Sequence, residues 1–127
     1  MFKKDYVMRL IQEAVRATLK LLFNIDTDKE EELVFSERER ETTYDELLEL
    51  INDGKINEAE NKLLGELDPK DMEYYKMALM FYSYLNEKDI DFLEEHDFSK
   101  NEIIDGLKYV SDIYGYGSMA GALLNVL

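Results

Sequence analysis

The chain has 127 residues, of which 46% are hydrophobic and 35% are charged, and its net charge is −14. This length suits one domain with one core, and the negative charge excludes nucleic acid as an expected ligand because phosphates would be repelled. The chain contains no cysteine, which excludes disulfides and cysteine-based zinc sites and fits a cytoplasmic location.

Positive charge is concentrated at the amino terminus. Residues 1–23 hold five Lys or Arg against two Asp or Glu, a net charge of +3, which leaves −17 for the other 104 residues. Charges at Arg9, Glu13, Arg16 and Lys20 interrupt the apolar pattern, so neither a membrane span nor a signal peptide is expected here. The acidic remainder favours a basic protein partner or a second copy of the chain, although acidity also serves solubility alone.

Residues 1–23 are predicted to contain one long amphipathic helix, because apolar residues recur at steps of three and four. Asn24 tolerates the left-handed conformation that often ends helices. One apolar stripe is a candidate homodimer interface, formed by Val7, Leu10, Ala14, Ala17 and Leu21. Docking of this helix on the chain's own body explains the stripe equally well, and association with an anionic membrane surface is a weaker alternative.

Residues 24–41 are rich in acidic residues and are predicted to connect the first helix to a helical body at 42–127, all within a single domain, 1–127. The body opens with a helix capped by Thr42 or Thr43, and Gly54 provides the reversal into a return helix over residues 56–67. A third helix is predicted from Pro69, with Asp68 as its cap, to about Leu85. It is apolar almost all round, so we expect it at the centre of the fold.

Three shorter helices complete the predicted body. The first covers residues 88–95, and the second opens with the capping box Ser99 to Glu102 and ends at Gly115. The last is capped by Ser118 and runs to Leu127. Because no alternating strand pattern occurs anywhere, the chain is predicted to be all-α.

An internal echo points to a helical-repeat fold. The residue pattern of segment 47–56 recurs in segment 81–90, 34 residues later. A repeat period of about this length is typical of arrays of helical hairpins. The turn at Gly54, the small Ala59 and the pair Asp68–Pro69 resemble the second half of a tetratricopeptide repeat. The resemblance covers about one and a half units over residues 43–98, and it implies a right-handed stack of helical hairpins. It departs from the family pattern at Lys88, where the second unit lacks a glycine.

The whole chain also resembles a family of small, acidic bacterial proteins with no assigned function. The resemblance rests on the segments 6–11, 53–60 and 81–85, read as YVMRLI, DGKINEAE and FYSYL. It implies no reaction, ligand or site.

Three residue patterns resemble metal-binding, catalytic or phosphate-binding sites, and each has a simpler structural explanation. Residues 49–60 resemble an EF-hand loop, but Ile51 stands where the third position needs an oxygen ligand. His96, the single histidine, is expected at a surface or a helix end. The glycines of residues 115–121 lack the spacing and the lysine of a phosphate loop. We therefore predict no catalytic, cofactor-binding or metal-binding residue.

The predicted function is accordingly non-enzymatic. The leading hypothesis is a protein–protein interaction module, and the alternative is a homodimeric assembly protein that uses its first helix. Seven tyrosines between residues 74 and 116 either fill the core, which we favour, or line a peptide groove.

Overall fold

The computed structural model describes residues 2–26 and 35–124, and in these residues it contains seven helices and no strand. The helices are α1 (Phe2–Phe23), α2 (Arg38–Asn52), α3 (Ile56–Leu64), α4 (Met72–Asn86), α5 (Ile90–Glu95), α6 (Lys100–Ile113) and α7 (Gly117–Leu124). The all-α prediction is therefore confirmed for the described part of the chain. Residues 27–34, which make up much of the predicted acidic connector, lie outside it.

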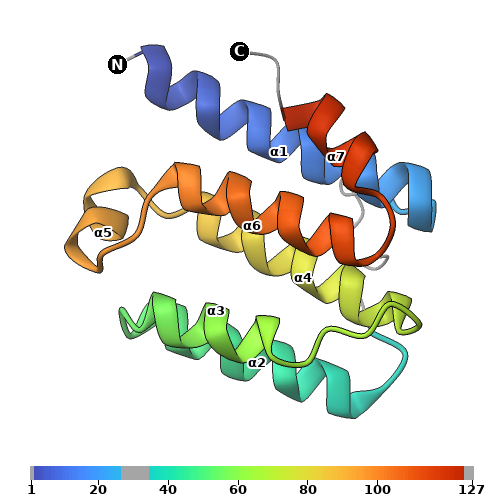
Figure 1. The fold of residues 1–127 in the computed structure, drawn as a ribbon. Coiled ribbons are helices and arrows are strands. Elements are labelled where there is room, and N and C mark those ends of the chain that lie inside the picture. Colours follow the sequence, from blue (N-terminus) through green and yellow to red (C-terminus); the bar gives the residue numbers. More distant parts are fainter. Residues whose placement is uncertain (1, 27–34, 125–127) are drawn as a thin grey trace.

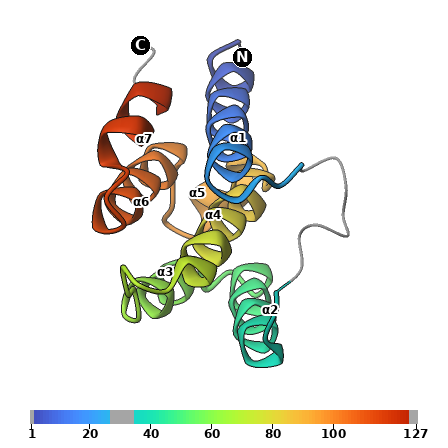
Figure 2. The same ribbon diagram turned by 90° about the vertical axis from the view of Figure 1, so that its right-hand side faces the viewer.

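The helices are arranged in layers around α4. One layer holds α1 and α7, the next holds α4 and α6, and α2 and α3 form the third, with the short α5 at one end (Figure 1). Seen end-on, α4 lies in the middle (Figure 2), and it packs against α1, α2 and α6. Ten of its residues are buried, so the predicted central position of this apolar helix is confirmed.

The 34-residue spacing seen in the sequence is also found between the first residues of the helices. Both α2 and α4 have 15 residues, and they begin at residues 38 and 72, which is 34 residues apart. The helices that follow them begin at residues 56 and 90, again 34 apart. The helices that follow α2 and α4 differ in length, since α3 has nine residues and α5 has six.

Most of the predicted helix ends are found in place. Asn24 has a φ of +54°, and Gly54 and Gly115 have φ values of +84° and +87°, the left-handed backbone that ends helices. At the start of α6, the Ser99 hydroxyl accepts a hydrogen bond from the backbone N–H of Glu102. Short-range signals thus placed these boundaries correctly.

The start of α4 differs from its prediction. Asp71, not Asp68, is the residue whose carboxylate accepts a hydrogen bond from the backbone N–H of Tyr74. Pro69 lies in the preceding turn, which is closed by a bond from Asp71 N to Asp68 O of 2.8 Å. Arg40 of α2 forms an ion pair with Asp71, and this contact between distant segments favours the later start.

Other boundaries shift by a few residues. Helix α2 begins at Arg38, before the predicted Thr42, and α3 ends at Leu64, before residue 67. Helix α5 begins after Asp89, whose side chain caps it. Helix α7 begins at Gly117, one residue before the predicted cap Ser118. A β-carbon at position 117 would lie 2.6 Å from Asp112 Oδ1.

Helix α1 packs on the body of its own chain, against α4, α6 and α7. Its inner face is buried through Ile11, Ala14, Val15 and Leu19. Polar contacts fix its position along α4, since Asn86 Nδ2 donates to Met8 O at 2.9 Å. One face of this amphipathic helix therefore belongs to the core.

Candidate interaction groove

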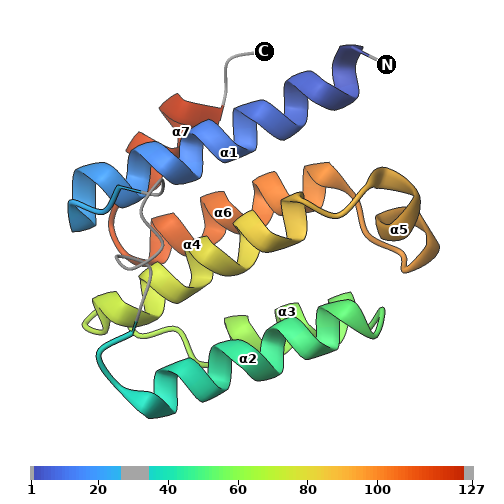
Figure 3. The same ribbon diagram turned by 180° about the vertical axis from the view of Figure 1, so that it is seen from behind.

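A groove of about 450 Å³ runs along α4 between α1 and α2. These three helices lie one above another when the molecule is seen from behind (Figure 3). Helix α1 contributes Gln12, Val15, Arg16 and Leu19 to the groove, α2 contributes Tyr44, and α4 contributes Met80, Ser83, Tyr84 and Glu87. The volume falls within the range of protein ligand sites.

The floor of the groove combines apolar side chains with one polar pair. Met80 of α4 supplies apolar surface, and beneath it lie Val15 and Leu19 of α1, which are 3% and 2% exposed and belong to the core. Between them, Ser83 Oγ donates to Gln12 Oε1 at 2.9 Å, and Gln12 Nε2 donates to Ser83 O at 3.4 Å. Because Gln12 and Ser83 already form hydrogen bonds with each other, a ligand need not supply polar groups at this point of the floor.

Two tyrosines stand on the α2 side of the groove. Tyr84 Oη donates to Asn52 Oδ1 at 2.7 Å, and Tyr44 Oη lies 3.5 Å from Met80 O. Burial, with smaller contributions from Tyr84, Glu87 and Asp45, raises the pKa of Tyr44 above its ordinary value. Tyr44 is therefore a neutral hydroxyl at physiological pH, and both rings offer amphipathic contact surface of the kind enriched at protein interfaces.

The predicted dimer stripe on α1 lies outside this groove. Ala14 is 5% exposed and belongs to the chain's own core, whereas Leu21 is 68% exposed. Val7, Leu10 and Ala17 are half-buried. The stripe is thus divided between the core and the surface, and Leu10, Ala17 and Leu21 are the members that a second copy could reach.

Sequence reasoning missed the groove because its walls come from three segments far apart in the chain. A local signal existed on α1, where Gln12 and Arg16 lie one turn apart beside the core residues Val15 and Leu19. What joins them to α2 and α4 is tertiary packing, which hydrophobic periodicity does not encode.

The other constellations have structural roles. Gly54 forms the turn between α2 and α3, and the residues the structure describes contain no group of three His, Cys, Asp or Glu that could hold a metal ion. His96 lies at the end of α5, as predicted, with Nδ1 2.7 Å from Phe92 O. Gly115 ends α6, and α7 follows it at once.

The tyrosines of residues 74–116 mainly fill the core, which agrees with the favoured prediction. Tyr74, Tyr75, Tyr82 and Tyr114 are buried, while Tyr109 is 53% exposed. Burial raises the pKa of Tyr74 to about 12. Tyr75 donates from its hydroxyl to Ser111 Oγ at 2.8 Å and stacks on the ring of Tyr114.

Residues 1–115 match the sequence profile of a protein family described as a family of unknown function, DUF6483. The chain belongs to this family. Comparison with curated proteins and with solved structures gave no match. Among the helices of the described residues, none combines the length and the apolar character needed to cross a membrane.

Proposed function

We propose that this member of the family is a non-enzymatic helical-repeat protein that binds other protein surfaces through the groove between α1, α2 and α4. The observation that carries the proposal is the groove itself, with an apolar floor, two tyrosines and charged residues at its margins. Interfaces with this make-up bury an apolar centre and leave a polar rim. The lack of cysteine fits action in the reducing cytoplasm.

The tetratricopeptide-like interpretation belongs to this proposal. In its favour, α2 with α3 and α4 with α5 recur at 34 residues, Gly54 turns the first hairpin, and Ala59 is fully buried. Two features depart from the repeat pattern, since α5 has only six residues and Pro69 lies in a turn rather than in a helix. Helical-repeat proteins commonly use a groove along their stacked helices for binding.

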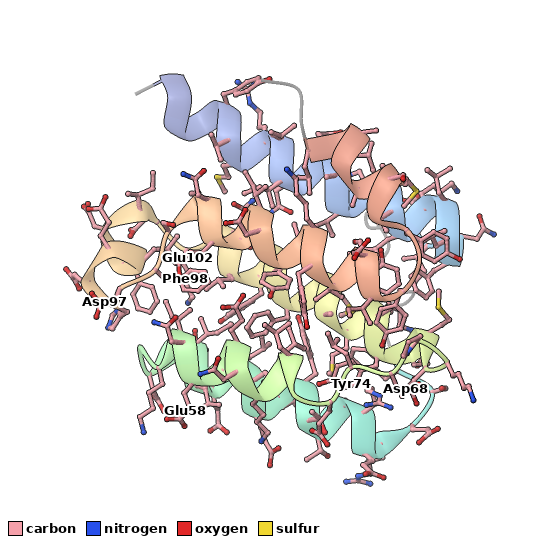
Figure 4. All side chains as sticks on the ribbon, viewed as in Figure 1. Glu58, Asp68, Tyr74, Asp97, Phe98 and Glu102 are labelled. Atoms are coloured by element: carbon pink, nitrogen blue, oxygen red, sulfur yellow. The ribbon has the colours of Figure 1, made fainter. Side chains whose placement is uncertain are left out.

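The test is photo-crosslinking from inside the groove in the native host cells. A benzoylphenylalanine replaces Met80 in one variant and Glu58 in a control, because Glu58 is exposed on α3 and points away from the other helices (Figure 4). We expect a dominant protein adduct from position 80, identified by mass spectrometry, and none from position 58. No adduct at position 80, or the same adducts from both positions, would overturn the proposal.

A further inference from the structure

Exposed charges of opposite sign flank the groove on α1 and α2, and Glu87 of α4 lines it between them. On the α1 rim, Arg16 lines the groove and Lys20 follows it one turn later, and both are exposed. On the α2 rim, Asp45 contributes to the raised pKa of Tyr44, and Glu41 precedes it by one turn; both are exposed. Among residues 2–26 and 35–124, no ion pair engages these four side chains.

The opposite charges lie at the same level along the groove. Helices α1 and α4 run in opposite directions (Figure 3), with Gln12 beside Ser83. Four residues further along α1 is Arg16, and three residues back along α4 is Met80, so these two are level. Tyr44, which contacts Met80 O, places the adjacent Asp45 at that level too.

The second pair of charges is matched in the same way. Lys20 lies one turn beyond Arg16 on α1, and Glu41 lies one turn before Asp45 on α2. Because α2 runs opposite to α1 (Figure 1), both steps lead toward the same end of the groove. Lys20 and Glu41 therefore also face each other across it.

This arrangement disfavours simple partners. A purely basic segment would meet Arg16 and Lys20, and a purely acidic one would meet Asp45 and Glu41. An occupant needs acidic groups above α1 and basic groups above α2, at matching levels. The chain's own surface has this property after a half-turn about an axis parallel to the groove, because that rotation exchanges the two rims and preserves the level.

We propose that a second copy of this chain closes the groove, with α1 of each copy lying over α2 of the other around a two-fold axis parallel to the groove. The inference rests on the proposed function and names the partner of the same surface. Arg16 of each copy pairs with Asp45 of the other, and Lys20 pairs with Glu41, so each contact occurs twice, as in any isologous interface. The apolar surface of Met80 becomes enclosed between the two copies.

Charge reversal tests this pairing with the purified full chain. By light scattering at low salt we expect a dimer for the wild type, and Arg16→Glu or Asp45→Arg alone raises the dimer dissociation constant by more than about tenfold, because like charges then meet twice. Mixing the two single variants restores dimers, since the two introduced charges are opposite and meet each other, while the native Arg16 of one variant meets the native Asp45 of the other. The double variant restores them because its two reversed charges again attract.

Matched controls separate this effect from net charge and from misfolding. Lys70→Glu and Glu58→Arg change the net charge equally but lie outside the groove lining, and they leave the dimer intact. Circular dichroism of each variant checks that the exposed substitutions preserve the fold. Dimers should also weaken as salt is added, because exposed ion pairs are screened.

Three outcomes overturn the dimer. They are a monomeric wild type, single reversals that dimerise as well as the wild type, and a mixture of the two single variants that stays monomeric. Failure of the dimer is distinguishable from failure of the proposed function. If position 80 cross-links to a different protein while the purified chain is monomeric, the groove still binds protein and only the identity of its partner was wrong.

Discussion

The imidazole of His96 lies directly against the backbone of Gly54, where a β-carbon would be 2.3 Å from His96 Nε2. The end of α5 thereby packs on the turn between α2 and α3. A second contact joins the same elements, since Asn57 Nδ2 donates to Asp97 O at 3.3 Å. The glycine at position 54 thus permits both the left-handed turn and the close approach of His96 at the end of α5.

Replacing this glycine should therefore be more damaging than replacing another glycine of the same conformation. Gly54→Ala combines backbone strain with a clash against His96, and we expect a loss of about 2–4 kcal/mol in the free energy of unfolding. Gly115→Ala has a similar φ of +87° but open space around it, so it should lose about 1 kcal/mol. Urea unfolding followed by circular dichroism measures both. Equal losses would show that the contact with His96 is unimportant.

The buried amide of Asn86 holds α1 and α6 to the end of α4. It donates to Met8 O at 2.9 Å and accepts from Lys100 Nζ at 2.8 Å, and it is 0% exposed. Asn86→Ala leaves Met8 O without its donor and leaves Lys100 Nζ with only the backbone carbonyl of residue 86, and it should destabilise the fold by about 2–3 kcal/mol.

Asn52 is the natural control for Asn86, because it occupies the equivalent position 34 residues earlier but is exposed. Its Oδ1 accepts from Tyr84 Oη and Lys88 Nζ, each at 2.7 Å. Asn52→Ala should destabilise by only about 0.5–1 kcal/mol, since water can replace the lost bonds. A loss at position 52 as large as that at position 86 would contradict the role assigned to burial.

The hydroxyl of Tyr82 should matter more at neutral pH than in acid. It donates to Glu60 Oε2 at 2.7 Å. Burial raises the pKa of Glu60, and the bond from Tyr82 lowers it again in part. A raised pKa in the folded state means that Glu60 favours folding most below pH 4.5, its reference pKa, and that stability is lost as pH rises through the folded value.

Tyr82→Phe removes the donor that stabilises the charged carboxylate. We expect a loss of about 2 kcal/mol at neutral pH and a smaller loss near pH 4, where Glu60 is protonated. In a chain that carries Glu60→Gln the carboxylate charge is absent, so the stability loss caused by Tyr82→Phe should depend little on pH. Urea unfolding across pH measures the effect, and a loss that is independent of pH would refute it.

The position of the α4 cap can be checked by a pair of aspartates. Asp71→Ala removes both the bond to Tyr74 N and the ion pair with Arg40, and it should cost about 1–2 kcal/mol. Asp68 caps no helix, although its carboxylate accepts a bond from Lys70 N at 3.0 Å. Asp68→Ala should therefore cost less, about 0.5 kcal/mol or below. A larger stability loss for Asp68→Ala than for Asp71→Ala would indicate that Asp68 caps α4, as the sequence predicts.

Local sequence signals were sufficient at three boundaries that depend on a single residue's backbone preference or on a nearby hydrogen bond. Gly54 and Gly115 adopt positive φ, and Ser99 caps α6. The same approach failed at Asp68, because its competitor Asp71 also gains an ion pair from Arg40, a residue 31 positions earlier. Two plausible caps three residues apart cannot be ranked without that contact.

The sequence by itself determined the helical class, the apolar central helix and the 34-residue spacing between helix starts, because periodicity and turn residues act over a few residues of chain. The tertiary structure alone decided that α1 docks along α4, since the contacts of Met8 and Gln12 with Asn86 and Ser83 span more than 70 residues. It alone formed the groove and brought Arg16 level with Asp45. Such placement depends on how side chains of separate helices interlock, and no local pattern carries that information.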